Sequence, residues 1–165
     1  MKYQPKFKMA GWAVALLNIL MIMQSTFYFL AVAKFPVEGW LFFNACAPSI
    51  ALYLAGFFLK RISVMAASLP FLAFFGVGGM FVFGWSGTSI YAQAGHICMA
   101  LAILYIAAEI YSSKAYKNMG VGLAAGIVSF LIILPIQQSY VAGHSDLQKK
   151  LGDPKFEEFM NEKNQ

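Results

Sequence analysis

Charged residues are scarce in this chain, and their scarcity indicates its class. Asp, Glu, Lys and Arg make up 12% of the 165 residues and hydrophobic residues 60%, whereas soluble domains carry roughly 25% charged residues. The mean hydropathy is +0.66, and the apolar residues come in long blocks. Such a composition predicts a protein that lies in a lipid bilayer. We expect one membrane domain over residues 1–142 and a tail over residues 143–165.

Cysteine and histidine are also rare, with two of each. Cys46 and Cys98 fall within apolar blocks and have neither CxxC nor Cys/His spacing, which argues against a disulfide framework and against a metal site. The sequence contains no HExxH, P-loop, GxGxxG or hydrolase triad, so an enzyme is not expected. The net charge of +5 does not indicate a nucleic-acid partner, because Lys and Arg stand at the ends of apolar blocks, where charge sets membrane topology.

Apolar sequence is what the chain has in abundance. About 20 apolar residues cross a hydrocarbon core of about 30 Å, and five blocks reach that length. No charge occurs from Ile62 to Ala108, which is too long for one crossing, so residues 84–89 (GWSGTS) are predicted to form a turn. The predicted fold is all-α, a bundle of five transmembrane helices. The predicted spans are residues 9–33, 39–59, 62–85, 89–113 and 118–142.

The distribution of positive charge predicts the orientation. The amino terminus and the second and fourth connectors carry three, two and two Lys or Arg residues, while the first and third connectors carry only Lys34. Positive charge marks the cytoplasmic side, so we expect the amino terminus in the cytoplasm of a prokaryotic cell and the tail outside its inner membrane. The tail is predicted to form two short amphipathic helices, one begun by Ser145 and one by Asp153 and Pro154.

Polar side chains within the spans gather in the outer half of the predicted bundle. At 1.5 Å of rise per residue they lie about 6 to 12 Å below the outer surface, with Gln24 slightly deeper. The set comprises Gln24, Asn44, Gln93, His96, Gln137 and Gln138. One interpretation is an outward-facing pocket for a small polar solute or a proton, with His96 as its pH-sensitive member. The alternative is that these side chains form hydrogen bonds between helices, which are common in membrane bundles.

Glu109 is the one carboxylate within a predicted span, four residues from its cytoplasmic end. If it faces the bundle interior, it is a candidate inner gate or proton station. Alternatively, it reaches the interface and pairs with Lys114 or Lys117. His96 lies about 20 Å away along the same helix, so the two residues do not form a catalytic pair.

Small residues predict close helix packing. Gly122 and Gly126 form a GxxxG motif in the last span, and such motifs let helix backbones approach closely. Packing within the bundle is favoured over a subunit interface. Pro70 predicts a kink in the third span.

Three functions agree with these patterns. The favoured one is a channel or transport subunit for a small polar solute or a proton. The second is a subunit that binds a cofactor, either a haem ligated by His96 and His144 or a quinone, although no residue pattern requires a cofactor. The third is an accessory subunit of a larger membrane complex. The expected partners are the lipid bilayer and either further copies of the chain or other membrane subunits.

Overall fold

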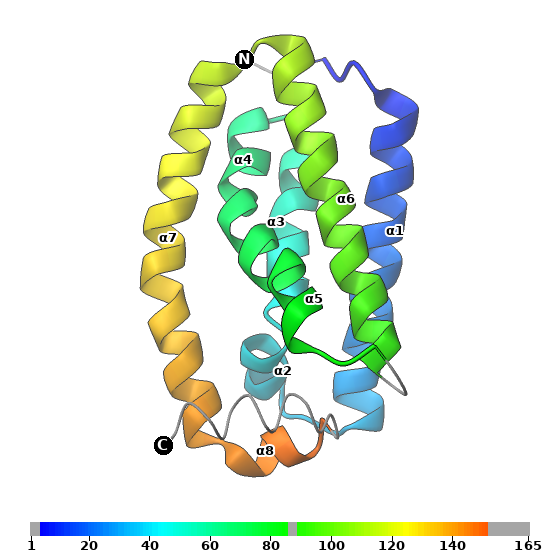
Figure 1. Ribbon diagram of the computed structural model, residues 1–165, viewed down its shortest axis with the longest axis vertical. Coiled ribbons are helices and arrows are strands. Elements are labelled where there is room, and N and C mark those ends of the chain that lie inside the picture. The colour runs from blue at the N-terminus through cyan, green and yellow to red at the C-terminus, as the bar shows by residue number, and fades with distance from the viewer. Residues whose placement is uncertain (1–3, 86–88, 152–165) are drawn as a thin grey trace.

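The computed structural model describes residues 4–85 and 89–151, and within these ranges the secondary structure is entirely helical (Figure 1). The all-α prediction is therefore confirmed for this part of the chain. The elements, in order, are α1 (Lys8–Phe27), η1 (Tyr28–Val32), α2 (Val37–Phe43), α3 (Cys46–Phe58), α4 (Ile62–Phe71), η2 (Leu72–Val77), α5 (Gly79–Val82), α6 (Ser89–Ser113), α7 (Tyr116–Gly143) and α8 (Ser145–Lys149). The two η elements are π-helices.

Four helical stretches are long and apolar enough to cross a membrane. They are Lys8–Val32, Ile62–Val82, Ser89–Ser113 and Tyr116–Gly143, and α2 with α3 adds a fifth if that pair counts as one span. Every predicted span begins and ends within three residues of these helical stretches. Such apolar helices are compatible with an integral membrane protein.

The predicted continuous helix over residues 39–59 is wrong, because α2 and α3 meet at an 80° bend. Asn44 leaves the helical conformation at φ −103° and ψ 55°. The physical cause is Pro48, four residues later. Proline has no N–H to donate to the carbonyl of Asn44, and its ring would collide with that carbonyl in a continuous helix. The Asn44 carbonyl accepts from the N–H of Ala47 instead, at 3.0 Å.

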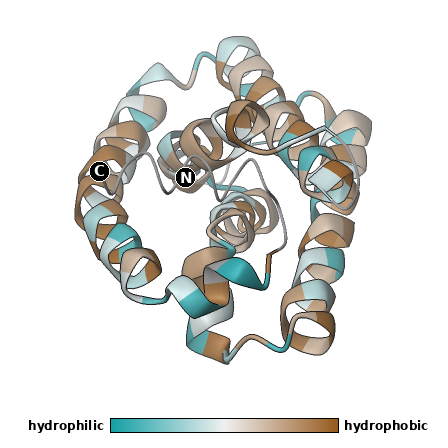
Figure 2. Ribbon diagram, turned by 60° about the horizontal axis from the view of Figure 1, so that its bottom comes forward, coloured by the Kyte–Doolittle hydropathy of each residue, from teal (hydrophilic) through white to brown (hydrophobic). Residues whose placement is uncertain are grey.

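The helices are arranged so that α1 and α7 form opposite edges of the bundle (Figure 1). α7 packs along α4, while α6 packs along η2 and α1. Hydrophobic residues make up much of each long helix (Figure 2). In α1 and in α7 only 11% of the most apolar stretch is buried inside the bundle, so both helices present wide apolar faces outward.

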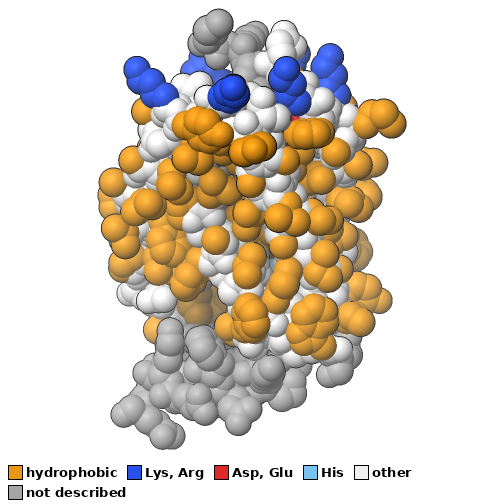
Figure 3. Space-filling model, turned by 45° about the horizontal axis from the view of Figure 1, so that its top comes forward, with side chains coloured by type: hydrophobic (Ala, Val, Ile, Leu, Met, Phe, Trp, Pro, Cys, Tyr) orange, Lys and Arg blue, Asp and Glu red, His pale blue; other side chains and the backbone are white. Residues whose placement is uncertain are grey.

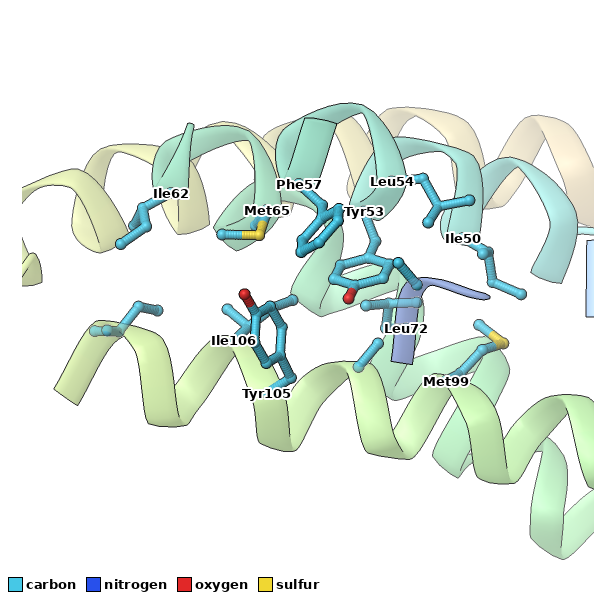
Figure 4. Close-up of a cluster of buried hydrophobic side chains, with 13 residues drawn as sticks. Ile50, Tyr53, Leu54, Phe57, Ile62, Met65, Leu72, Met99, Tyr105 and Ile106 are labelled. Atoms are coloured by element: carbon cyan, nitrogen blue, oxygen red, sulfur yellow. The ribbon is translucent and has the colours of Figure 1, made fainter. Parts of the chain in front are cut away.

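The core is a seam between α3 and α4 on one side and α6 on the other (Figure 4). Tyr53 and Phe57 of α3 meet Tyr105 of α6, with ring centroids 6.5 and 6.0 Å apart. Met65 and Ile106 are fully buried beside them. Of the two cavities described below, the smaller one borders this seam at Phe57, and no residue of the seam lines the larger one.

Glycines bring α7 into contact with α4. A Cβ added at Gly122 or Gly126 would collide with the backbone carbonyl of Ser63 or Ala67, respectively. The predicted packing of the GxxxG motif within the bundle is therefore confirmed. Gly120, on the same helix, has nothing within 4 Å of its Cβ position.

Lysines end three of the helical stretches in the left-handed conformation. Lys34, Lys60 and Lys114 have φ values of 54°, 54° and 52°. After Lys60 the N–H of Arg61 donates to the carbonyl of Gly56 at 2.9 Å, which is the long hydrogen bond of a Schellman-type helix end. A cation at this position also interacts favourably with the helix dipole.

Six of the nine described Lys and Arg residues lie at the end of the molecule that shows the blue side chains in Figure 3, and the other three, Lys34, Lys149 and Lys150, lie at the opposite end. The end with six of them, the basic end, holds the start of α1, the α3–α4 connection and the α6–α7 connection (Figure 1). The second predicted tail helix, from Asp153 on, lies outside the described residues, as do residues 86–88 of the predicted GWSGTS turn.

Candidate functional site

Gln93 and His96 form the best-connected polar pair, one turn apart on α6. Both are buried, at 1% and 3% exposure. The Gln93 amide nitrogen donates to the carbonyl of Phe83 at 2.8 Å and to those of Met80 and Gly84 at 3.3 Å. Its oxygen lies 3.1 Å from His96 Nδ1. Because carbonyls at the end of a helix have no donor within that helix, Gln93 satisfies the end of α5 and fastens it to α6.

The ring of His96 fills the space beside a glycine. A Cβ at Gly79 would lie 2.6 Å from His96 Nε2. The ring of Phe83 packs against the other side, with centroids 5.4 Å apart. His96 is therefore enclosed by α5 and the residue that follows it.

Asn44 and Gln137 make separate connections elsewhere. Asn44 is buried at the α2–α3 break, and its amide nitrogen donates to Ser25 Oγ on α1 at 3.1 Å. Gln137 on α7 donates to the carbonyl of Phe42 at 3.0 Å, which again satisfies a carbonyl in the last turn of a helix, here α2.

Gln24 and Gln138 are exposed, and neither side chain makes a hydrogen bond to any residue that the structure describes. None of the six predicted pocket residues lines either of the two cavities described below. Four of them join neighbouring helices in three separate places, and two face outward from α1 and α7.

Glu109 is fully buried and faces the start of α1. Its two oxygens accept the backbone N–H groups of Phe7 at 2.8 Å and Lys6 at 3.0 Å. Within the described residues its carboxylate is used in this way, not in an ion pair with Lys114 or Lys117. Hydrogen bonds to an ionised group and the positive end of the α1 dipole offset the cost of burying the charge.

The two histidines proposed as haem ligands have different surroundings. His144 follows the end of α7, where its ring stacks on Tyr140 with centroids 4.1 Å apart and its Nδ1 lies 2.8 Å from the carbonyl of Tyr140. No contact joins it to His96 in the described part of the chain. The same residues contain no group of three or more His, Cys, Asp or Glu side chains placed to hold a metal ion.

The structure adds two features that the sequence analysis missed. A cavity of about 490 Å³ lies between α2 and α7, lined by Phe42, Pro135, Ile136, Ser139 and Tyr140. A cavity of about 200 Å³ lies at the basic end, lined by Gln4, Pro5, Lys8, Trp12, Phe57 and Lys60. The i, i+4 spacing of Lys8 and Trp12 was a usable signal for the second cavity, because it places both side chains on one face of α1.

Comparison of the chain with protein families, with curated proteins and with solved structures finds no match.

Proposed function

We propose that this protein is an accessory subunit of a larger membrane complex, a five-span helical bundle in the cell membrane of a prokaryote. Its amino terminus lies in the cytoplasm, and its role is to bind transmembrane helices of another subunit through the outer faces of α1 and α7. The gathering of Lys and Arg at one end of the bundle supports this orientation.

The hydrogen bonds of the buried polar side chains favour an accessory role over transport. Asn18 Oδ1, Thr26 Oγ1 and Trp40 Nε1 have no partner in the described chain, but each of the polar or charged side chains that are buried makes at least one hydrogen bond within it. They are Asn18, Asn44, Ser49, Ser68, Gln93, His96 and Glu109. A transport path needs inward polar groups that remain available to a solute, and the two described cavities are lined by other residues.

The observation that carries the proposal is the pair of outward-facing amides. At about 1.5 Å per residue, Gln24 lies about 12 Å from the end of the Lys8–Val32 helical stretch, and Gln138 about 8 Å from the end of α7. An amide in hydrocarbon without a hydrogen-bond partner costs free energy. Between two membrane helices the same amide stabilises the contact by about 0.6 kcal/mol. The outward faces of α1 and α7 are thus suited to a partner helix.

α7 offers a partner helix more than its amide. Pro135 has no N–H, so the carbonyl of Leu131 lacks its usual helical donor. The 490 Å³ cavity beside Pro135 is shallow and wide open, and Ser139 also lines it. Such a hollow on the helix that carries Gln138 fits a partner helix that brings its own hydrogen-bond donors.

Photo-crosslinking in cells tests the proposal. A benzophenone amino acid is placed at Gln24, at Gln138 and, as a control, at Leu104, which is 65% exposed on α6. We expect discrete adducts from positions 24 and 138 that are heavier than the 18.2 kDa chain, and none from position 104. Mass spectrometry then identifies the partner.

Each other outcome contradicts the proposal in a distinct way. Adducts of twice the chain mass indicate a homo-oligomer. Equal adducts from all three positions indicate non-specific contacts in the membrane. Absence of adducts, together with solute or proton flux in proteoliposomes of the isolated chain, supports transport instead.

A further inference from the structure

The cavity at the basic end combines positive charge with aromatic walls. Lys8 and Lys60 both line it, together with Gln4, Pro5, Trp12 and Phe57. Its volume of about 200 Å³ corresponds to roughly six water molecules at about 30 Å³ each, which leaves room for a phosphate-sized group. The two ammonium groups come from elements far apart in the sequence, so the fold creates the site.

The positions of the two lysines follow from the backbone. Lys8 is the first residue of α1. Lys60 follows α3 in the left-handed conformation, where its N–H donates to the carbonyl of Phe57 at 3.1 Å. Both lysines are therefore attached to fixed points at the mouth of the cavity.

Within the described residues, no carboxylate neutralises the positive charge of Lys8 and Lys60. The described residues contain Glu38, Glu109 and Asp146 as their acidic side chains, and only Glu109 lies at this end. Glu109 is fully buried, and its oxygens accept backbone N–H groups. The lysines of the cavity are thus available to an external anion.

The surface next to the cavity is apolar and aromatic. The ring of Trp12 stands edge-on to Phe57 and Phe58, with centroids 5.3 and 5.9 Å apart. Trp12, Phe58 and Leu16 are each more than half exposed, and Leu16 lies one turn farther along α1 than Trp12. A ligand here meets positive charge at the end of the bundle and an apolar track along its side.

We propose that this cavity binds an anionic phospholipid, with the phosphate between Lys8 and Lys60 and an acyl chain along Trp12, Leu16 and Phe58. Free phosphate would satisfy the lysines but not the apolar track. Trp is favoured at membrane interfaces, and anionic lipids are attracted to clusters of Lys and Arg beside membrane spans. The proposal rests on the membrane placement argued above but does not depend on a partner subunit.

Native mass spectrometry of the full-length protein in detergent tests the proposal. Phosphatidylglycerol, phosphatidylcholine with the same acyl chains and inorganic phosphate serve as probes. We expect phosphatidylglycerol to bind at least tenfold more tightly than phosphatidylcholine, and millimolar phosphate to leave the lipid in place.

Paired substitutions locate the site. Lys8→Gln with Lys60→Gln is expected to weaken phosphatidylglycerol binding about 30-fold, at about 1 kcal/mol per lysine. Lys114→Gln with Lys117→Gln removes the same charge from the same end without touching the cavity, and we expect less than a threefold change. Lys8→Arg with Lys60→Arg should keep binding within threefold of wild type.

Three results overturn the proposal. Equal weakening by the two Gln pairs indicates diffuse surface charge instead of a site. Equal binding of the two lipids shows that the net negative charge of the lipid is not recognised, because both lipids carry a phosphate and only phosphatidylcholine adds a cation. Displacement by inorganic phosphate shows an anion site without the lipid track. Thermal melting of each variant confirms that it is folded, so loss of binding is not mistaken for unfolding.

Discussion

At the scale of single residues, the buried carboxylate of Glu109 has a testable structural role. It accepts the N–H groups of Lys6 and Phe7 and so ties the amino-terminal segment to α6. In Glu109→Gln the charge is lost and an N–H₂ group replaces one acceptor. Hydrogen bonds to charged groups contribute about 1.5 to 3 kcal/mol. We therefore expect the amide hydrogens of Lys6 and Phe7 to exchange about 10- to 100-fold faster, as measured by hydrogen–deuterium exchange.

The control for this change is Glu38→Gln, which removes an exposed carboxylate at the opposite end of the bundle. It should leave exchange at Lys6 and Phe7 unchanged. If Glu109→Gln also leaves exchange unchanged, the carboxylate does not hold the amino terminus, and a role as a proton station gains support.

Two glutamines allow the same substitution to be compared inside and outside the bundle. Gln93→Leu removes the amide donor that the carbonyls of Phe83 and Gly84 share with that of Met80, which still accepts from Trp85 Nε1 at 3.2 Å. An unsatisfied buried polar group costs about 1 to 3 kcal/mol, so the thermal unfolding temperature of the isolated protein should fall. Gln138→Leu removes no hydrogen bond in the described chain and should leave that temperature unchanged, while reducing crosslinking to a partner. A similar fall for both variants would contradict the assigned hydrogen bonds.

The sequence predicts the depth of these residues better than their direction. Counting residues along a span gives the height of Gln93, Gln137 and Gln138, because the helical rise is constant. Successive residues point about 100° apart around a helix, so which glutamine faces inward depends on the neighbouring helices. The donors to Glu109 lie 102 and 103 residues away in the chain, and no local pattern indicates them.

At the scale of helices, the contact between α7 and α4 depends on two glycines. Gly122→Ala with Gly126→Ala adds methyl groups that would collide with the carbonyls of Ser63 and Ala67. Overpacking of this kind costs about 1 to 3 kcal/mol, and we expect a lower unfolding temperature. Gly120→Ala is the control, because its methyl group meets nothing within 4 Å and alanine favours the helix. Destabilisation by Gly120→Ala to the same extent would contradict the close contact.

Helix ends are largely predictable from this sequence, and interruptions within helices are less so. Basic residues and turn-forming residues end the apolar blocks, which explains why the predicted and observed ends agree. Pro70 signalled an irregularity, and α4 passes into the π-helix η2 at Leu72. Pro48 indicates the bend at Asn44 in the same way, but a prediction from hydropathy alone treats residues 39–59 as one apolar helix.

At the scale of the whole molecule, polar side chains in different parts of the bundle have different roles. Inside the bundle the buried amides and Glu109 join helices, whereas Ser49 and Ser68 bond to carbonyls one turn away. At the basic end polar groups line a cavity, and on α1 and α7 they face outward. The sequence predicts a helical membrane bundle and the residues that matter for it. The sequence does not predict which of these residues contact one another. Lipid tails are as apolar as the helix surfaces, so contacts between helices depend on side-chain packing, which hydropathy does not indicate.

The number of membrane crossings depends on the bent pair α2 and α3. α3 has 13 residues, or about 20 Å at 1.5 Å per residue, which is short of a 30 Å core. However, η1 ends at one end of the bundle and α4 begins at the other (Figure 1), so the pair carries the chain across, with α2 and the bend completing the distance. We therefore expect five crossings, with the α6–α7 connection in the cytoplasm and the end of α8 outside the cell membrane. In a background with Cys46→Ala and Cys98→Ala, an impermeant maleimide should label Lys149→Cys in intact cells and Lys117→Cys only after permeabilisation. With the amino terminus in the cytoplasm, labelling of Lys117→Cys but not of Lys149→Cys in intact cells would mean that α2 and α3 enter and leave the membrane on one side, because every later crossing would then be reversed.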